Sequence, residues 1–327
     1  MKTRKLGNSD LNTSIMGLGC MTMAGLYGTA DEKECIATIH AAIDAGVTFI
    51  DTADAYGGGS NELLVGKAIA DRREKVLLAT KFGNIFSKNP GRGADGRPEY
   101  LREACEASLK RLGTETIDLY FQHRVDKEVP IEETVGAMSI LLEEGKIRSV
   151  GLSECSSDTL RRAHRVHPIS ALQSELSLWT QFSLSDHVKV CRELGVTYVA
   201  YSPLGRGILT GTIKTDADMG EHDRRREHPR FQGGNLMHNL NILAPIKALA
   251  TSKDCLPAQI ALSWVLAQGD DIVPIPGCKQ QQHLRENIAA VDIHLSDSEL
   301  QWLNEEIPPD FTAGSRYPEA QMWTLNL

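Results

Sequence analysis

The sequence predicts an α/β fold, a closed (β/α)8 barrel of the TIM type in which residues 1–327 form one domain. Short β-rich runs alternate with helical patterns along nearly the whole chain. Several of the runs are continuously apolar, as in Val76-Leu77-Leu78-Ala79, which is typical of strands buried on both faces of a parallel sheet. No linker rich in Pro, Gly or Ser divides the chain, and this favours a single domain.

Eight barrel strands and a preceding hairpin are expected. Residues 2–6 and 11–13 flank the turn formers Gly7-Asn8-Ser9-Asp10, and this pattern predicts an N-terminal β-hairpin that closes the bottom of the barrel. The barrel strands are predicted at residues 15–19, 47–51, 76–80, 117–121, 147–152, 169–173, 197–201 and 271–275.

The segments between these strands carry signals for helix starts and ends. Asp31 is a favourable N-cap, and Glu34 completes a capping box. Ile39 and Ile43 then share one face, and Gly46 ends the helix. The other predicted helices run from Pro98 to Gly113, from Pro130 to Gly145, and from a Ser185 cap to Gly195.

A doubly wound open sheet is the alternative architecture. It is disfavoured because the nearest match to a dinucleotide-binding loop, Gly17-Leu18-Gly19-Cys20-Met21-Thr22, lacks the third glycine. Long connections are expected at residues 21–30, 83–97 and 205–239. The last contains Glu221-His222-Asp223-Arg224-Arg225-Arg226-Glu227-His228, which indicates a solvated, mobile loop rather than a nucleic-acid site.

Composition and charge exclude several classes of partner. The 327 residues are 41% hydrophobic and 24% charged, and the net charge of −8 argues against broad binding to nucleic acid or to an anionic membrane. No apolar segment follows the basic N-terminus, so no signal peptide or membrane span is expected. Seven dispersed cysteines without a C-x-x-C pair suit reduced thiols in the cytoplasm and give no metal-site spacing.

Polar residues gather where the predicted buried strands end. Asp51 ends the second strand and Tyr56 follows it closely, while Lys81 and His123 follow the third and fourth strands. In a barrel these strand ends meet on one face, where barrel enzymes keep their active sites. We therefore expect the four side chains to converge.

Together the four residues would suit protonation of a carbonyl oxygen. The Lys81 ammonium would lower the pKa of Tyr56, Asp51 would hold Lys81 by a salt bridge, and His123 would orient the substrate oxygen. The hydride would have to come from a cofactor, because no side chain supplies one. Each residue alone also has a simpler interpretation: a helix cap, a surface lysine, a packed tyrosine or a hydrogen-bonded core histidine.

Six stretches in a fixed order add a family resemblance. They are Asp51-Thr52-Ala53-Asp54-Ala55-Tyr56-Gly57, Ala79-Thr80-Lys81-Phe82-Gly83, Ile117-Asp118-Leu119-Tyr120-Phe121-Gln122-His123, Lys146-Ile147-Arg148-Ser149-Val150-Gly151-Leu152-Ser153-Glu154, Ala200-Tyr201-Ser202-Pro203-Leu204-Gly205-Arg206-Gly207 and Ile275-Pro276-Gly277-Cys278-Lys279. Over nearly its whole length the chain resembles the aldo-keto reductase superfamily. Two further stretches, Gln122-His123-Arg124-Val125-Asp126 and Ala163-His164-Arg165-Val166-His167-Pro168, are most similar to its branch of perakine and pyridoxal reductases.

The resemblance implies a catalytic tetrad of Asp51, Tyr56, Lys81 and His123, with NADPH lying across the barrel mouth. It implies that Tyr201 stacks on the nicotinamide and that Ser153 and Gln173 bind its carboxamide. The remaining implied cofactor contacts are Ser202, Leu204, Gly205 and Arg206 at the pyrophosphate, Pro276, Gly277, Cys278, Lys279 and Gln280 toward the adenosine end, and Glu286 and Asn287 at the adenine.

Three positions depart from the common family pattern. Glu154 stands where many relatives have asparagine, Cys278 replaces a serine or threonine near the 2′-phosphate, and Gln280 replaces an arginine. Because a 2′-phosphate prefers bidentate arginine, Lys279 alone would be a weaker clamp. NADPH is the expected cofactor, and NADH is the alternative.

The expected activity is NADPH-dependent reduction of aldehydes or ketones to alcohols, with a small carbonyl compound as the partner. An NADPH-binding regulatory subunit, similar to the potassium-channel β subunits, is the alternative, and a barrel enzyme of other chemistry is a third possibility. The sequence leaves the substrate, the oligomeric state and the physiological direction open. Residues 21–30, 83–97 and 308–327 are expected to contact substrate, with candidate aromatic walls at Tyr27, Phe82, Phe86, Trp179 and Trp323.

Overall fold

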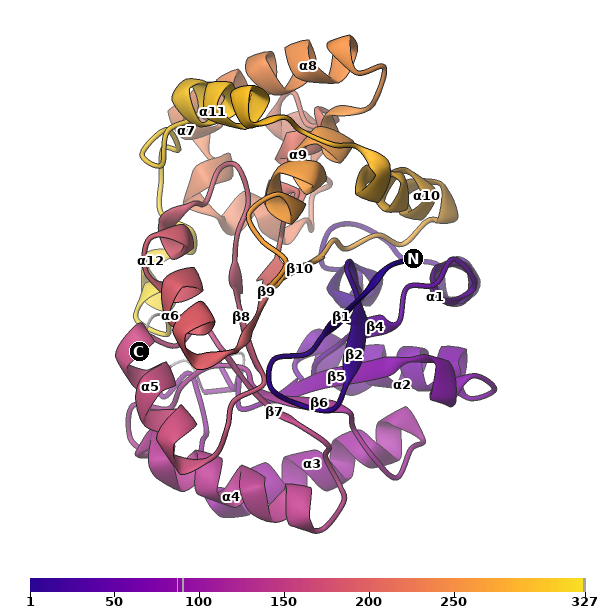
Figure 1. Cartoon of the computed structure of the whole chain (residues 1–327), viewed down its shortest axis with the longest axis vertical. Coiled ribbons are helices and arrows are strands. Elements are labelled where there is room, and N and C mark those ends of the chain that lie inside the picture. Colours follow the sequence, from indigo (N-terminus) through magenta and orange to yellow (C-terminus); the bar gives the residue numbers. More distant parts are fainter. Residues whose placement is uncertain (87, 90, 326–327) are drawn as a thin grey trace.

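Eight parallel strands form a barrel, as the sequence predicts (Figure 1). The computed structural model describes residues 1–86, 88–89 and 91–325. The strands pair in chain order, and a bridge between Gly19 and Gly277 brings the first strand against the segment after the last. They are β3 (Leu18–Gly19), β4 (Phe49–Asp51), β5 (Leu77–Phe82), β6 (Leu119–Gln122), β7 (Val150–Ser153), β8 (Ala171–Glu175), β9 (Thr197–Tyr201) and β10 (Ile272–Ile275).

The predicted strand positions hold best at the C-terminal ends, which carry the functional residues. The strand at Thr197–Tyr201 has the predicted bounds, whereas the first barrel strand shrinks to Leu18–Gly19. It starts late because the Ile15 amide donates to the Lys2 carbonyl of the hairpin instead of joining the barrel.

Helices surround the strands in Figure 1, with α1 to α6 and α8 to α11 forming the outer layer. They are α1 (Glu32–Asp44), α2 (Ser60–Ile69), α3 (Pro98–Leu112), α4 (Ile131–Glu143), α5 (Ser157–Val166), α6 (His187–Leu194), α7 (Gly233–Asn239), α8 (Leu243–Ser252), α9 (Pro257–Leu266), α10 (Gln281–Ala289), α11 (Asp297–Glu306) and α12 (Glu319–Met322). Within the described residues, no helix is both long and apolar enough to cross a membrane.

Two of the predicted helix caps need correction. Asp31 accepts from the Glu34 amide as expected, but the Glu34 carboxylate accepts from the Gln281 amide, so only half of the capping box forms. Ser185 does not cap α6, because its hydroxyl donates to the Phe182 carbonyl and the helix begins after Asp186.

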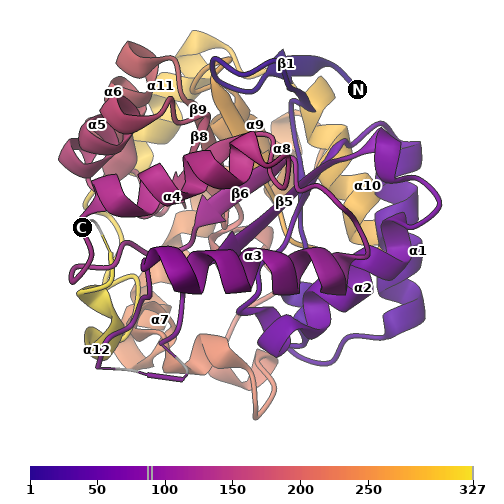
Figure 2. The same cartoon turned by 90° about the horizontal axis from the view of Figure 1, so that it is seen from below.

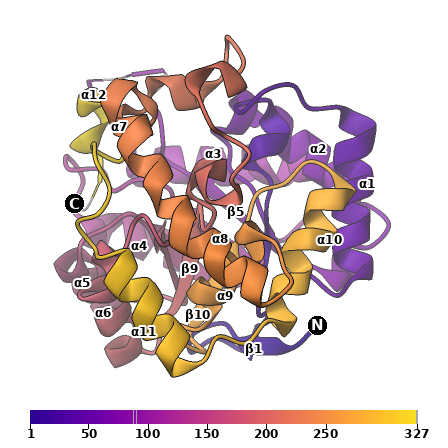
Figure 3. The ribbon, with the colours of Figure 1, turned by 90° about the horizontal axis from the view of Figure 1, so that it is seen from above.

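The N-terminal hairpin covers one end of the barrel, as predicted. Its strands are β1 (Thr3–Lys5) and β2 (Asn12–Ser14). Leu6 and Leu11 between them pack with the side chains that fill the barrel interior, including Phe49 and Phe121. Figures 2 and 3 show β1 at one end of the molecule and α7 and α12 at the opposite end. The hairpin therefore closes the end away from the C-terminal segment.

Residues 205–239 are only partly the solvated loop that the sequence predicts: residues 214–218 and 220–222 are exposed, but other positions are packed. Met219 and Phe231 are each 1% exposed within this segment, and the amide of Arg224 donates to the Leu26 carbonyl. The segment consists largely of short 3-10 turns and α7. It therefore covers part of the barrel mouth next to residues 21–30.

Close packing inside the barrel gives a first testable prediction at Gly151 in β7. A Cβ atom there would lie 2.4 Å from the Phe121 ring. We expect Gly151→Ala to lower the free energy of unfolding by about 1–3 kcal/mol, the usual cost of overpacking a core. Urea unfolding would measure it, with Gly136→Ala in α4 as the matched control.

An added Cβ at Gly136 meets nothing within 4 Å. Because alanine favours a helix interior, that control should be neutral or stabilising by about 0.5–1 kcal/mol. Equal effects of the two substitutions would refute the packing argument.

Candidate active site

Side chains at the ends of β4 and β5 form a hydrogen-bonded chain. Lys81 is fully buried, and its Nζ donates to Asp51 Oδ2 at 2.6 Å, to the Thr52 carbonyl at 2.8 Å and to Tyr56 Oη at 3.2 Å. The other Asp51 oxygen accepts from Gln173 Nε2 at 2.8 Å. All three ammonium protons therefore have acceptors, which fixes the position of Lys81 beside the Tyr56 hydroxyl.

His123 lies beside this chain, immediately after β6. Its ring packs edge-on to Tyr56 with 5.7 Å between the ring centroids. Burial, together with the nearby charges of Arg124 and Lys81, lowers the pKa of His123 well below its usual value. Its Nδ1 is buried and has no hydrogen-bond partner among the described residues. His123 is therefore a neutral imidazole at physiological pH.

The expected lowering of the Tyr56 pKa is wrong. Burial and the negative charge of Asp51 raise the pKa of Tyr56 well above its usual value, and Arg124 offsets this only in part. Lys81 Nζ donates to Tyr56 Oη at 3.2 Å, but it is also paired with Asp51 at 2.6 Å, and the pKa of Tyr56 stays raised. The Tyr56 hydroxyl is therefore protonated throughout the physiological pH range.

A cavity of about 690 Å³ opens over these groups. Most of the residues that the sequence analysis assigned to catalysis or cofactor binding line it: Asp51, Tyr56, His123, Ser153, Gln173, Tyr201, Ser202, Leu204, Arg206, Gly277, Cys278, Lys279, Glu286 and Asn287. Lys81 lies behind the wall, bonded to Asp51 and Tyr56. The assigned residues that are not part of this lining are Gly205, Pro276 and Gln280.

Glu154, which stands where many relatives have asparagine, is paired with Arg316 of the C-terminal segment. Burial opposes its ionisation, but Arg316 donates to its two oxygens at 3.0 and 2.7 Å, and the pKa of Glu154 falls to about 2. Tyr201 Oη also donates to this carboxylate at 2.7 Å. Glu154 therefore ties the C-terminal segment to the end of β7.

A second buried carboxylate joins more arginines to this cluster. Glu175, fully buried in β8, lies 3.5 Å from Arg206, 3.7 Å from Arg230 and 3.6 Å from Arg316. Arg206 lines the cavity, but its Nη1 donates to the Arg316 carbonyl at 2.8 Å. The Arg206 guanidinium, expected at a cofactor pyrophosphate, is thus part of a buried ion-pair network.

Strained backbone concentrates around the same cavity. Glu154, Ser202 and Arg206 have φ values of 53°, 48° and 56°, a region that residues with a side chain adopt at a cost of about 1–3 kcal/mol. Each follows the C-terminal end of β7 or β9 by one to five positions. Such strain is common at functional sites, where the surrounding contacts hold it in place.

Several residues that line the cavity were not predicted from the sequence, and Arg124 and Tyr317 are two of them. Arg124 lines the wall next to His123, and Tyr317 Oη lies 3.1 Å from Tyr201 Oη. The Arg124 guanidinium carbon is 6.0 Å from the centre of the Tyr317 ring. Adjacency to His123 was the available signal for Arg124. No motif marks Tyr317, although the C-terminal segment as a whole was expected at the site.

Lys279 and Arg225 also line the cavity. Lys279 Nζ donates to the carbonyls of Tyr27, Gly28 and Thr29 at 3.1, 3.0 and 2.5 Å. The Arg225 guanidinium lies 5.1 Å from the centre of the Tyr27 ring. Arg225 is already paired with Asp223 at 2.6 Å, so it adds no unpaired charge beside Lys279. An anionic ligand such as a nicotinamide dinucleotide fits a cavity that is lined by both the catalytic groups and Lys279.

The aromatic walls were predicted with mixed success. Tyr27 and Phe86 line the cavity, but Phe82 and Trp179 are buried elsewhere. Phe82 stacks on Tyr120 with 5.0 Å between ring centroids, and Trp179 packs edge-on to Phe231. The Lys127 ammonium lies 4.4 Å from the centre of the Trp323 ring, and Trp323 does not line the cavity. Positions 87, 90, 326 and 327 of the predicted substrate-contact segments lie outside the described residues.

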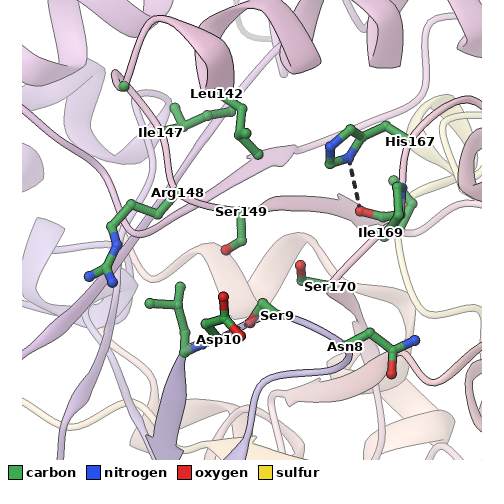
Figure 4. A pocket seen from close by; sticks show the side chains of 13 residues that line it. Asn8, Ser9, Asp10, Leu142, Ile147, Arg148, Ser149, His167, Ile169 and Ser170 are labelled. Carbon is green, nitrogen blue, oxygen red and sulfur yellow. Dashed lines mark hydrogen bonds between the residues drawn. The ribbon is translucent and has the colours of Figure 1, made fainter.

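A second cavity of about 470 Å³ lies under the turn of the N-terminal hairpin (Figure 4). Asp10, Arg148 and His167 are the titratable side chains that line it. Nδ1 of His167 is hydrogen-bonded to the Pro168 carbonyl at 3.1 Å, and Arg148 is paired with Asp118 at 3.0 Å. None of the four predicted catalytic residues lines this second cavity.

Comparison with known proteins identifies the family of the chain. The model of the Aldo/keto reductase family matches residues 15–307. The chain is 48% identical over 315 residues to a protein named probable aldo-keto reductase 1 from Glycine max, covering 96% of this chain and 91% of that protein.

Solved structures give the same result. The glycerol dehydrogenase AKR11B4 from Gluconobacter oxydans superposes with a TM-score of 0.83 at 30% identity, covering 94% of this chain and 96% of that one. An aldo/keto reductase from Klebsiella pneumoniae, solved with NADP and acetate, gives 0.76 at 28% identity over 97% of this chain and 99% of that one.

Proposed function

The chain belongs to the aldo/keto reductase family, and we propose that it reduces aldehydes or ketones to alcohols with NADPH, using Tyr56 as the proton donor. The observation that carries this proposal is the Asp51–Lys81–Tyr56 chain at the cavity wall. Because Lys81 donates to Tyr56 Oη, the phenol's own hydrogen is left to donate to another group. A substrate carbonyl oxygen in the cavity would accept it.

Each residue of the site has its own proposed role in carbonyl reduction. When bound, the reduced nicotinamide supplies the hydride to the carbonyl carbon. Neutral His123 donates a hydrogen bond that orients the carbonyl oxygen, and Tyr56 gives that oxygen its proton. The phenolate left on Tyr56 lies 3.2 Å from the Lys81 ammonium, which stabilises it until a proton returns from water.

Ser153 and Tyr201 line the cavity and are proposed to position the nicotinamide. Gln173 is proposed to share in this through its carbonyl oxygen, because its amide nitrogen already donates to Asp51. Lys279 is proposed to bind the 2′-phosphate, and its charge supports NADPH over the alternative NADH. The Klebsiella pneumoniae relative, solved with NADP, is consistent with that choice.

Lys279→Met tests the cofactor proposal. The variant should raise the KM for NADPH roughly tenfold, as expected for the loss of one charge-assisted hydrogen bond, and change the KM for NADH little. Steady-state kinetics with both cofactors would measure it. Equal effects on the two cofactors, or a wild-type preference for NADH, would rule out the NADPH assignment.

Two further proposals concern the whole chain. We propose that residues 1–327 act as one domain, and that the protein works in the cytoplasm, where its seven unpaired cysteines stay reduced. A single cooperative unfolding transition seen by several probes would support the first, and separate transitions would contradict it.

The activity itself is tested by following NADPH absorbance with 4-nitrobenzaldehyde as substrate. We expect steady oxidation of NADPH that depends on both protein and aldehyde. Tight NADPH binding without turnover of this or other reactive aldehydes would instead favour a regulatory cofactor-binding protein.

A further inference from the structure

The cavity wall beside His123 contains a buried guanidinium that has no carboxylate partner. Arg124 is 7% exposed and lines the cavity. Its Nη1 donates to the His123 carbonyl at 2.6 Å and lies 3.5 Å from Ser153 Oγ. Across residues 1–86, 88–89 and 91–325, no ion pair joins it to an aspartate or glutamate, and its Nε and Nη2 have no hydrogen bond.

The other buried arginines of this region are all paired. Arg206, Arg230 and Arg316 share the carboxylates of Glu154 and Glu175. Arg124 adds a fourth cation to this group without a third carboxylate, so the substrate side of the cavity carries excess positive charge. A buried charge without a partner is costly, and a ligand that supplies the opposite charge removes that cost.

Arg124 also keeps its positive charge, because its pKa is raised. Burial favours the neutral form, but the oxygens of Tyr317 and Tyr201 and the charge of Glu154 together raise its pKa. Its free Nε and Nη2 can donate two parallel hydrogen bonds, the geometry in which arginine binds carboxylates. Because Arg124 follows His123 in the chain, an anion bound there would lie near the reacting carbonyl group.

We propose that Arg124 binds a carboxylate of the substrate, so that the preferred substrates are aldehydes or ketones that carry a carboxylate group. This inference rests on the proposed reductase function and specifies the substrate class of the same site. Lys279 and Arg225 differ from Arg124 because they already have partners, three backbone carbonyls for Lys279 and Asp223 for Arg225.

Two aldehydes that differ in charge test the inference directly. In 4-formylbenzoate the ring and aldehyde match those of methyl 4-formylbenzoate, but only the first is an anion. For the wild type we expect kcat/KM to be at least tenfold higher for the anion. Arg124→Gln should reduce that ratio by roughly ten- to a hundredfold, the range for a lost charge-assisted hydrogen bond, and Arg124→Lys should retain part of it.

Arg165→Gln is the matched control, because it removes the same charge from an exposed position on α5 outside the cavity. It should leave the ratio unchanged. A wild-type ratio of one or less, or equal losses for both aldehydes in Arg124→Gln, would overturn the inference. So would a tenfold weaker Kd for NADPH in Arg124→Gln with an intact ratio, because Arg124 would then bind the cofactor.

Failure of the reductase proposal has a different signature. In that case wild-type protein reduces neither aldehyde with NADPH or NADH. Calorimetry of benzoate binding to the NADP-loaded protein then decides the inference by itself. Binding by wild type that is lost in Arg124→Gln and kept in Arg165→Gln would support it, and equal binding by all three would refute it.

Discussion

Tyr56→Phe is expected to lower kcat for aldehyde reduction by about 10²–10⁴-fold, the usual contribution of a positioned general acid. The substitution removes one oxygen and keeps the ring that packs against His123. Lys81 keeps its contacts with Asp51 and the Thr52 carbonyl, so the buried ion pair should survive. The loss should therefore appear in kcat with little change in the Kd for NADPH, measured by fluorescence titration.

Tyr120→Phe provides the matched control. Its hydroxyl is buried and has no hydrogen-bond partner among the described residues, and it does not line the cavity. Its kcat should stay within about twofold of wild type, since no bond is lost. A Tyr56→Phe enzyme with full activity would move the proton donor to another group, with His123 the nearest candidate.

The pH profile gives a second check on the same residue. Because burial and Asp51 raise the pKa of Tyr56, the protonated donor persists below that raised pKa, and kcat should not fall between about pH 7 and 9. The lowered pKa of His123 keeps the imidazole neutral over the same range. An alkaline decline near pH 8 in wild type that is absent from Tyr56→Phe would contradict this assignment.

The convergence of the four catalytic candidates was predictable because it depends on topology. Each follows or ends a buried strand, and parallel strand ends in a barrel meet on one face. Alternation along a strand could have corrected one error as well. Since Lys81 points toward the barrel mouth, its neighbour Phe82 must point to the opposite face, where it stacks on Tyr120.

The charge network was not predictable, because its members are far apart in sequence. Arg316 and Glu154 are separated by 162 positions, and neither lies in a pattern that specifies the other. The same holds for Arg225, which sits in a charge-rich segment of the kind that usually faces solvent. Which charges are buried depends on how residues 205–239 and the C-terminal segment pack over the barrel mouth, a tertiary property that local periodicity does not encode.

Arg316→Met is expected to lower the free energy of unfolding by about 3–5 kcal/mol at neutral pH, because it leaves Glu154 buried without its main counter-charge. Arg316 contacts Glu154 through two hydrogen bonds and also lies 3.6 Å from Glu175. Methionine retains much of the side-chain volume, so the effect should come from charge. Urea unfolding would measure it.

The matched control is Arg102→Met. Arg102 also makes two hydrogen bonds to one carboxylate, that of Glu144, but the two side chains are 41% and 35% exposed. Exposed pairs of this kind contribute about 0–1 kcal/mol, so the control should be nearly neutral. Similar losses in both variants would show that burial of the Glu154 pair is unimportant.

The pH dependence separates loss of charge pairing from loss of packing. Arg316 and its hydrogen bonds overcome burial and hold the pKa of Glu154 at about 2, below the ordinary 4.5. Because the pKa is lower in the folded state, the ionised Glu154 stabilises the fold above pH 4.5, and this stabilisation is lost as the pH falls toward 2. The contribution of Glu154 to the free energy of unfolding is about 3 kcal/mol. In Arg316→Met the Glu154 carboxylate has no guanidinium beside it. Protonating Glu154 therefore removes an unpaired buried charge and raises the free energy of unfolding of the variant. The difference in unfolding free energy between wild type and variant should therefore shrink between pH 5 and pH 3, whereas a packing defect would keep it constant.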